Sequence, residues 1–411
     1  MDSKKLYWLW LQGALGPGAR TDEITAVFPS PEKMYLAGEI EWKLSGVLTK
    51  KQIEKLSAYS PKQAQGIAEL CNNNGWQIIT PDDATYPRNL RNIRNFPLAL
   101  FVQGDISKVC NNVCVAVVGT RKASFQGSHL AHRYAAALSH AGICVVSGAA
   151  LGIDSAAHNG SLSADGPTAA VLGCGFGVNY LMENRHLRDD ISKSGALITE
   201  FPPGTPASPK TFPVRNRIIS GLSEATIVIE AGIKSGSLIT ANFAMEQGRD
   251  VFAPPGDVFN SSYAGANRLI KDGARPLFSI FDVIEEYALR FSDKIRSEDV
   301  EKALQYLGGK RELSQEEKGR PIKTVVRQIN PQTDSENHGE PKFEVAKLIS
   351  IPTDLSDKAK TVYDSFGEAP LFADEIAKNT GLAPWEVISA LTELELADLV
   401  CLCAGKRYKK I

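Results

Sequence analysis

Two arginines at the start of a predicted helix are the residues in this sequence whose types and spacing most clearly indicate a chemistry. Arg215 and Arg217 lie in the segment 213–222, an apolar strand follows at 226–230, and a small-residue turn then opens a second helix at Ser237. Helix N-termini and exposed glycine amides attract anions, and the two guanidinium groups add full positive charges. The stretch therefore predicts a site for a phosphate-bearing ligand.

The two arginines are expected to occupy different positions in the site. They are two residues apart and cannot share one face of a helix, so we expect one to reach deep into the pocket and the other to line its rim. The apolar residues that follow should hold the helix against a sheet, namely Ile218, Ile219 and Leu222. We expect that replacing both arginines with alanine removes most of the binding and leaves the fold intact.

Strand, glycine turn and helix alternate along the middle of the chain, which predicts a parallel sheet covered by helices on both faces. The expected fold is an α/β fold with an extended Rossmann-like sheet, whose central strands lie at 113–118, 143–147, 168–172, 196–200, 226–230 and 250–253. Two earlier strands, at 77–80 and 98–103, should extend it. In such sheets ligands bind beyond the carboxyl ends of the strands.

Nearly every one of these strands is followed by glycine, and four of the following loops carry cations. Gly119 and Arg121 follow the first central strand, Gly148 follows the second, and a glycine-rich loop at 173–177 follows the third. A dinucleotide site is the obvious alternative. However, the first strand is not followed by GxGxxG, and the second ends at Ser147, where a ribose-binding acid is expected. We therefore expect no nicotinamide or flavin cofactor.

Asp154 and His158 lie four residues apart on a predicted helix and share a face, which would suit an acid/base pair. The alternative is that Asp154 caps the helix and His158 hydrogen-bonds back to it. No nucleophile stands at a motif-like spacing from them, so we favour this alternative and expect no catalytic residue. Glu200 and Glu230 end buried strands and are expected to accept hydrogen bonds from loop amides.

The composition is that of an ordinary globular protein with room for several domains. The chain has 411 residues, of which 43% are hydrophobic and 23% charged, and its formal net charge is -1. A nucleic-acid partner would therefore have to be attracted by local clusters of Lys and Arg. The seven cysteines form no CxxC pair, and Gln12 and Gly13 interrupt the first apolar run. We expect reduced thiols, no metal site, no membrane span and a cytoplasmic location.

Four regions are predicted along the chain: a helical, SAM-like or helix-hairpin-helix-like domain at 1–65, the Rossmann-like domain at 66–290, a flexible linker at 291–350 with a helix at 297–307, and a winged-helix-like domain at 351–411. The Gly-Pro-Gly turn at 16–18 could grip a DNA phosphate or merely connect two packed helices. Few cations beyond Arg20 flank it, so packing is favoured.

The predicted recognition helix of the C-terminal domain has the wrong charge for duplex DNA. Segment 384–396 carries Glu386, Glu393 and Glu395 and has no Lys or Arg. Cations are confined to the predicted wing, at Lys406, Arg407, Lys409 and Lys410. We therefore expect an accessory or protein-contacting module.

The ordered motifs of the middle region closely resemble those of the DprA/Smf family. They include Val117-Val-Gly-Thr-Arg121, Gly152-Ile-Asp-Ser-Ala-Ala-His158, Phe212-Pro-Val-Arg-Asn-Arg217, Ser235-Gly-Ser-Leu-Ile-Thr240 and Gly265-Ala-Asn-Arg-Leu-Ile-Lys-Asp-Gly-Ala274. The resemblance implies a bacterial DNA-processing protein that binds and protects single-stranded DNA and forms homodimers. It also implies that the protein helps to load the recombinase RecA during natural transformation, without catalysis.

The resemblance and the loops that it covers together give the candidate DNA-binding residues. In the third loop the family usually has Tyr-Pro with a nearby lysine, whereas Leu181 follows Tyr180 here, so Arg185 is expected to supply that charge. Aromatic rings in these loops could stack on bases while the cations meet phosphates. The candidates are Gly119, Arg121, Lys122, Gly148, Phe176, Tyr180, Asn184, Arg185, Phe212, Arg215, Asn216, Arg217, Lys234, Ser235, Gly236 and Ser237.

A nucleotide-processing or nucleotide-sensing enzyme is the alternative function. The sequence also resembles phosphoribohydrolases, whose Gly-Gly-x-Gly-Thr loop precedes a catalytic acid, but here no acid follows Ser235 until Glu246. For the homodimer we expect an interface on the apolar helices after the sheet, unless these residues simply cover the last strand. They are Leu269, Ile270, Ile280, Phe281, Val283 and Ile284.

Overall fold

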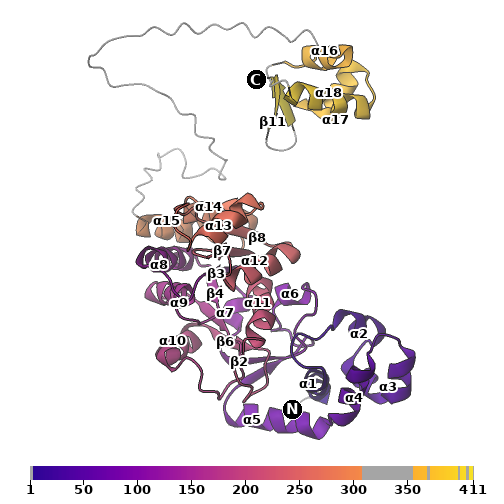
Figure 1. Ribbon diagram of the computed structural model, residues 1–411, viewed down its shortest axis with the longest axis vertical. Coiled ribbons are helices and arrows are strands. Elements are labelled where there is room, and N and C mark those ends of the chain that lie inside the picture. The colour runs from indigo at the N-terminus through magenta and orange to yellow at the C-terminus, as the bar shows by residue number, and fades with distance from the viewer. Residues whose placement is uncertain (1–2, 308–354, 368–370, 397–398, 404–406, 411) are drawn as a thin grey trace. The chain divides into compact units, whose positions relative to one another are not determined.

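The computed structural model describes residues 3–307, 355–367, 371–396, 399–403 and 407–410, and the chain divides into two compact units, Met1–Pro321 and Ile322–Ile411 (Figure 1). The first unit contains a large sheet and a helical N-terminal part. Helix α15 (Ser297–Tyr306) forms where a helix is predicted, and most of the predicted linker lies outside the described residues. The four domain boundaries stay a prediction.

Nine strands of the first unit form one sheet in the order β1-β2-β6-β5-β4-β3-β7-β8-β9. At one edge β1 (Gln77–Ile79) pairs antiparallel with β2 (Leu100–Gly104), which pairs antiparallel with β6. The remaining pairs are parallel and involve β3 (Cys114–Val118), β4 (Cys144–Ser147), β5 (Thr168–Val171), β6 (Ala196–Thr199), β7 (Ala225–Val228), β8 (Asp250–Ala253) and β9 (Arg275–Pro276). The predicted extended Rossmann-like sheet is confirmed, and β9 is an addition to it.

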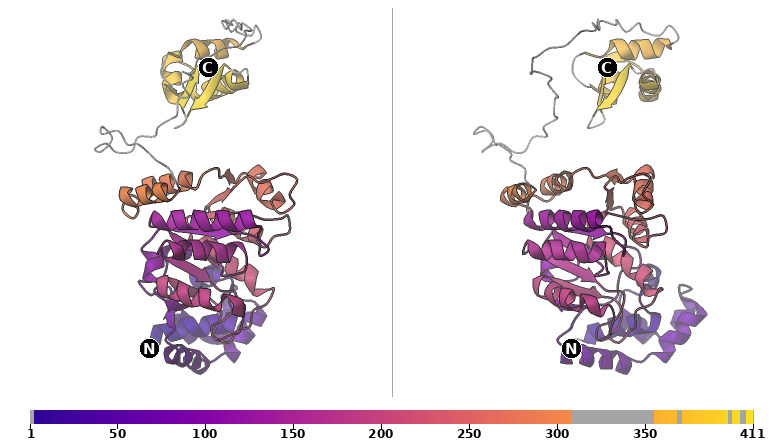
Figure 2. Two further views of the ribbon diagram at one scale, coloured as in Figure 1. Left: turned by 90° about the vertical axis from the view of Figure 1, so that its left-hand side faces the viewer. Right: turned by 60° about the vertical axis from the view of Figure 1, so that its left-hand side comes forward.

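Helices cover both faces of the parallel strands. One face carries α8 (Phe125–His140), α9 (Ile153–Ser163), α10 (Arg185–Ser194), α14 (Ile280–Arg290) and α15, and the other carries α11 (Thr211–Leu222), α12 (Ser237–Glu246) and α13 (Ala264–Lys271). Figure 2 shows α15, α8, α9 and α10 side by side. Successive β3 residues point to opposite faces, so Ala116 packs with α11 while Val117 packs with α8. Strands buried on both faces account for the continuous apolar runs in the sequence.

The N-terminal part consists of α1 (Ser3–Leu15), α2 (Asp22–Val27), α3 (Pro31–Leu44), α4 (Lys50–Ala58) and α5 (Pro61–Asn73), and short helices α6 (Arg88–Arg91) and α7 (Ser107–Cys110) follow. Trp10 and Trp42 are buried in its core, which continues into the sheet at Phe101. In the turn after α1, Gly18 has φ +72° and its amide donates to Glu200 at 3.2 Å. This turn therefore binds a carboxylate of the same chain, which favours the packing interpretation.

Four of the six residues predicted for the dimer interface are unavailable to a partner, while Ile270 and Phe281 are partly exposed. Leu269, Ile280, Val283 and Ile284 are buried within the chain, where they cover the sheet, so they offer no surface to a second copy. Their helical spacing indicates an apolar face but not what covers it.

The C-terminal unit contains α16 (Asp357–Asp364), α17 (Ala373–Thr380) and α18 (Pro384–Leu396), and a sheet of β10 (Leu371–Phe372), β12 (Arg407–Lys410) and β11 (Val400–Cys403) in that order. This is the predicted arrangement of three helices with a wing. On α18, Glu386 pairs with Lys358 at 2.8 Å and Glu393 accepts hydrogen bonds from Ser356, so both carboxylates are bound by the unit itself. None of the described helices is both long and apolar enough to cross a membrane.

Candidate functional site

The order of the strands opens a crevice at the carboxyl edge of the sheet, between β3 and β7. The chain leaves β3 toward β4, β5 and β6 on one side and returns through β7 on the other, so the loops after these two neighbours diverge. A cavity of ≈ 480 Å³ lies there, hereafter the switch-point cavity. Its lining includes Gly119, Thr120, Arg121, Asp154, Phe212, Arg215, Asn216, Ser235, Gly236 and Ser237.

A second cavity of ≈ 330 Å³, hereafter the third-loop cavity, lies beyond β4 and β5. Its lining is rich in aromatic rings and guanidinium groups and includes Trp76, Gly148, Gly173, Phe176, Tyr180, Arg185, Arg188, Phe212 and Arg215. The rings of Trp76 and Phe176 pack with their centroids 5.3 Å apart. Because Ala150, Phe212 and Arg215 line both cavities, the two are neighbours.

The ring of Phe212 lies at the centre of the site. The guanidinium carbon of Arg121 is 4.8 Å from its centroid, that of Arg215 is 5.9 Å away, and the ring of Tyr180 is 5.6 Å away, centroid to centroid. A glycine is required at position 173, because a Cβ there would come within 2.7 Å of the Phe212 ring. One aromatic ring is thus flanked by two cations, a combination that suits a nucleobase with its phosphates.

Arg215 is the buried cation of the site. Its side chain is 4% exposed, its Nη1 donates to the carbonyl oxygen of Val171 at 2.6 Å, and its Nε has no partner among the described residues. Gly148 makes room for it, since a Cβ there would lie 1.9 Å from Nη1. Burial lowers the pKa of Arg215, and Asp154 opposes that shift. A buried guanidinium with an unused donor is well placed to meet an anion.

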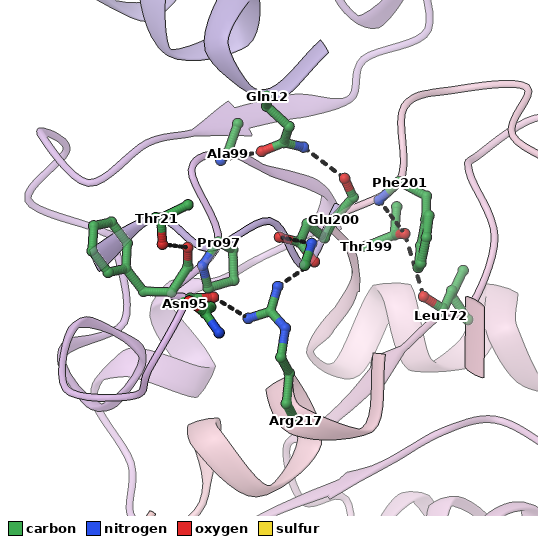
Figure 3. Close-up of polar contacts among 12 residues, drawn as sticks. Gln12, Thr21, Asn95, Pro97, Ala99, Leu172, Thr199, Glu200, Phe201 and Arg217 are labelled. Atoms are coloured by element: carbon green, nitrogen blue, oxygen red, sulfur yellow. Dashed lines mark hydrogen bonds and ion pairs between the residues drawn. The ribbon is translucent and has the colours of Figure 1, made fainter. Parts of the chain in front are cut away.

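Arg217 does not line the rim, so that expectation is wrong. It lines neither cavity. Its side chain points toward Asn95 and Glu200 (Figure 3). It is 6% exposed, forms an ion pair with Glu200 through Nη2, and donates from Nη1 to the carbonyl oxygen of Asn95 at 2.7 Å. Residues two apart on a helix lie on nearly opposite sides, so Arg215 and Arg217 serve opposite faces of α11. This geometry gives Arg217 a supporting position and not the predicted contact with ligand.

Glu200 connects three distant segments at this point (Figure 3). It follows β6, pairs with Arg217 of α11 and accepts the amide hydrogen of Gly18, while its carbonyl oxygen accepts a hydrogen bond from Gln12 Nε2 at 2.6 Å. The side-chain carbonyl oxygen of Gln12 accepts a hydrogen bond from the backbone amide of Ala99. Burial raises the pKa of Glu200, and Arg217 opposes that shift. The predicted role of Glu200 as an acceptor of a loop amide is confirmed.

Asp154 and His158 do not form the predicted hydrogen bond with each other. His158 is fully buried, its Nδ1 lies 2.7 Å from the hydroxyl of Thr168, and burial lowers the pKa of His158 to about 3. Asp154 instead accepts the amide hydrogen of Ala150 at 3.4 Å, beside Arg215. Asp154 therefore supports the loop after β4, whereas His158 connects α9 to the start of β5, so both roles are structural but with partners other than those predicted.

Of the other predicted residues, some hold the loops in place and others lie next to the lining of the switch-point cavity. Asn184 is buried and donates to the carbonyl oxygen of Ala149 at 3.0 Å, so it holds the loop after β4 in place. Glu230 likewise accepts from the amide of Ser124 at 3.0 Å, as predicted. Lys122 and Lys234 are exposed, each next in sequence to a residue that lines the switch-point cavity.

Trp76, Arg188 and Asp189 are among the residues of the third-loop cavity that sequence reasoning missed. Trp76 reaches it because the antiparallel pair β1 and β2 extends the sheet, and no local motif indicates this. Arg188 follows Arg185 by three residues on α10 and donates to the carbonyl oxygen of Leu181 at 3.0 Å. Its helical spacing from Arg185 is a signal that could have revealed it.

Comparisons with known proteins agree with this architecture. Residues 77–288 match the family model of DNA recombination-mediator protein A, and residues 350–406 match that of the DprA winged helix domain. Protein Smf of Synechocystis sp. is 34% identical over 81% of this chain and 80% of its own length. DNA processing protein DprA of Bacillus subtilis is 38% identical over 56% of this chain and 78% of its own length.

A solved structure extends the likeness to three dimensions. The X-ray structure of DNA processing protein A from Streptococcus pneumoniae is 32% identical in sequence and superposes with a TM-score of 0.60. The match covers 70% of this chain and 99% of that one. The shared fold therefore extends well beyond a few motifs.

Arg217→Ala should destabilise the first unit by about 3 to 5 kcal/mol, because it leaves the Glu200 carboxylate buried without its cation. The Arg215→Ala/Arg217→Ala variant is therefore expected to lose its fold, contrary to the expectation from sequence. Urea denaturation followed by tryptophan fluorescence would measure the loss. In a double-mutant cycle with Glu200→Gln, the losses of unfolding free energy caused by the two substitutions should not be additive. Additive losses would contradict a direct interaction between Arg217 and Glu200.

Stability should fall as the pH is lowered below about 6.5, because His158 stays neutral in the fold but takes up a proton when the chain unfolds. Its folded pKa is lowered to about 3, so this stabilisation is present above pH 6.5 and is lost as the pH approaches 3. At pH 5 the loss is about 2 kcal/mol. His158→Gln, which keeps a partner for Thr168, should flatten this part of the denaturation profile, and an unchanged profile would refute the assignment.

Proposed function

The chain belongs to the DNA recombination-mediator protein A family, and we propose that it binds single-stranded DNA at the carboxyl edge of its sheet without catalysing a reaction. The observation that carries this proposal is the ring of Phe212, which lies beside Arg121 and Arg215 where the two cavities meet. A base can stack on such a ring while its phosphates meet guanidinium groups and the amides at the start of α12.

The shape of the site favours a single strand over a duplex. Phe212 and Tyr180 are half-buried between loops, so a base must leave its stack and turn toward them. Besides the carboxylates of Asp154 and Asp189, the polar groups around them are guanidinium groups, hydroxyls and backbone amides, which suit phosphates. Binding should therefore depend little on base sequence.

The geometry weakens the alternative of a nucleotide-processing enzyme. His158 is fully buried, and Asp154 faces Arg215. Glu246, the first acid after the turn at Ser235, is the last residue of α12, which places it about 14 Å along the helix axis from Ser237. We expect no base to be released when the protein is incubated with nucleoside monophosphates, and release would support the enzyme.

We infer the cellular role from the family resemblance. The protein would protect incoming strands during natural transformation and help to load RecA, acting in the cytoplasm. In the winged-helix unit Glu386 pairs with Lys358 and Glu393 accepts from Ser356, while Trp385 and Ile388 are exposed on α18. Exposed apolar side chains at helical spacing support the proposal that this unit contacts a protein.

We propose that the homodimer forms at the β9 end of the sheet. Val258, Phe259 and Phe278 are 77% to 95% exposed there, and they follow the carboxyl ends of β8 and β9. Strand β9 is an edge of the sheet, where unpaired backbone groups and apolar side chains favour association. This surface replaces the interface predicted from the sequence.

Arg121→Ala and Phe212→Ala should each weaken binding to oligothymidylate about tenfold or more, because each removes a charge-assisted or stacking contact worth roughly 1.5 to 3 kcal/mol. Fluorescence anisotropy would measure this, with Lys193→Ala, an exposed lysine at the far end of α10, as the control. For the unaltered protein, log K should fall against log salt with a slope of about -3. Equal affinity for a blunt duplex would overturn the proposal.

Phe278→Asp should convert the dimer to a monomer, because it places a charge in the apolar surface at the β9 end. Sedimentation velocity at tens of micromolar would detect the change. Ile40→Asp, at an equally exposed apolar residue on α3, is the matched control and should remain dimeric. A dimeric Phe278→Asp variant would exclude this surface, and a monomeric unaltered protein would exclude the dimer.

A further inference from the structure

Helix α8 begins with an exposed aromatic ring beside the candidate site. Phe125 is 87% exposed, and its ring stacks nearly parallel to that of His129, with an interplanar angle of 9° and centroids 6.2 Å apart. Arg133 continues the same spacing of four residues, so the three side chains share one face of the helix. A phenylalanine this exposed contributes little to the core, and it is available to a partner.

A groove runs along this face between α8 and α9. It has a volume of ≈ 780 Å³ and is lined by Phe125, Ser128, His129, His132 and Arg133 of α8, by Ala156 and Asn159 of α9, and by Tyr306 of α15. The described residues that line it include no carboxylate. Figure 2 shows α8 and α9 side by side on the outer face of the sheet. An aromatic platform among imidazoles and a guanidinium, without acids, suits a polyanion with planar bases.

One short segment of the chain connects the lining of the switch-point cavity to the start of the groove. Arg121 lines the switch-point cavity, and Phe125 begins α8 four residues later. Between them, the Ser124 hydroxyl caps α8 by accepting from the Gly127 amide at 2.9 Å and donates to Glu230 at 2.9 Å. A Cβ at Gly127 would lie 2.1 Å from a carboxylate oxygen of Glu230, so the helix start is packed closely onto β7. Phe125 is therefore held at a fixed place beside the cavity.

We propose that a single strand leaving the switch-point cavity continues over α8, with a base stacked on Phe125 and His129 and phosphates bound by Lys122 and Arg133. This inference rests on the proposed function and adds a second segment to the binding surface. From Phe125 to Arg133 the path follows the helix axis for about 12 Å. Only a strand long enough to fill the cavity and to reach beyond it can use these contacts.

Affinities for oligothymidylates of about 5 and about 20 nucleotides distinguish the two segments of the binding surface, because only the longer strand can reach beyond the cavity to α8. The Phe125→Ala/Arg133→Ala variant should lose about tenfold or more in affinity for the long strand and keep its affinity for the short one. Its salt slope for the long strand should become shallower by about one for the lost phosphate contact. Phe125→Trp, which keeps a stacking face, should retain the affinity for the long strand.

The controls distinguish this proposal from the one on which it rests. Leu36→Ala and Lys193→Ala, at exposed positions on α3 and α10, should bind both oligonucleotides as the unaltered protein does. Unchanged affinity of the double variant for the long strand would overturn the path over α8 and leave the cavity site standing. An equal loss of affinity for both oligonucleotides would also overturn it. So would a Phe125→Trp variant that does not retain the affinity for the long strand. If the unaltered protein binds neither strand, the proposed function itself is wrong.

Discussion

The buried ion pair between Arg217 and Glu200 is the interaction on which the geometry of the site depends. Two charges withdrawn from water are tolerated only when each is paired and its remaining hydrogen-bonding groups are used. Here the carbonyl of Asn95 and the amide of Gly18 supply additional bonds, although Arg217 Nε has no partner among the described residues. The pair therefore locks the N-terminal turn, the end of β6 and helix α11 into one relative arrangement, which none of the three segments could fix by itself.

With α11 fixed in this way, the direction of the Arg215 side chain is fixed as well. It lies two residues before Arg217, so its guanidinium must emerge on the opposite side of the helix, between the two cavities. Gly148 provides the space, Asp154 partly compensates the charge, and Asn184 holds the loop that carries Gly148. The result is a preorganised cation that need not be ordered again when an anion arrives, which reduces the cost of binding.

The protein achieves a cationic edge although its net charge is only -1. The parallel strands end at the same edge, so loops distant in sequence bring Arg121, Arg185 and Arg215 around Phe212 and Tyr180. Two acids that follow strands of this edge, Glu200 and Glu230, are turned inward, where they bind Arg217 and Ser124. Local arrangement and not bulk composition therefore sets the potential that a phosphate meets.

The sheet, the glycine loops at its carboxyl edge and the family could be predicted from the sequence, because strand and helix periodicity and motif order are local properties of the chain. It could not decide which of Arg215 and Arg217 faces the ligand, since the two are chemically identical and the choice depends on Glu200. It also could not show that Ile280 and Val283 are covered by the chain itself, because an apolar helix face has the same pattern whether it meets its own sheet or a second molecule. The position of Trp76 depends on an antiparallel edge that only strand pairing reveals. Contacts between segments far apart in sequence decide these matters, because burial, charge pairing and exposure are properties of the packed molecule.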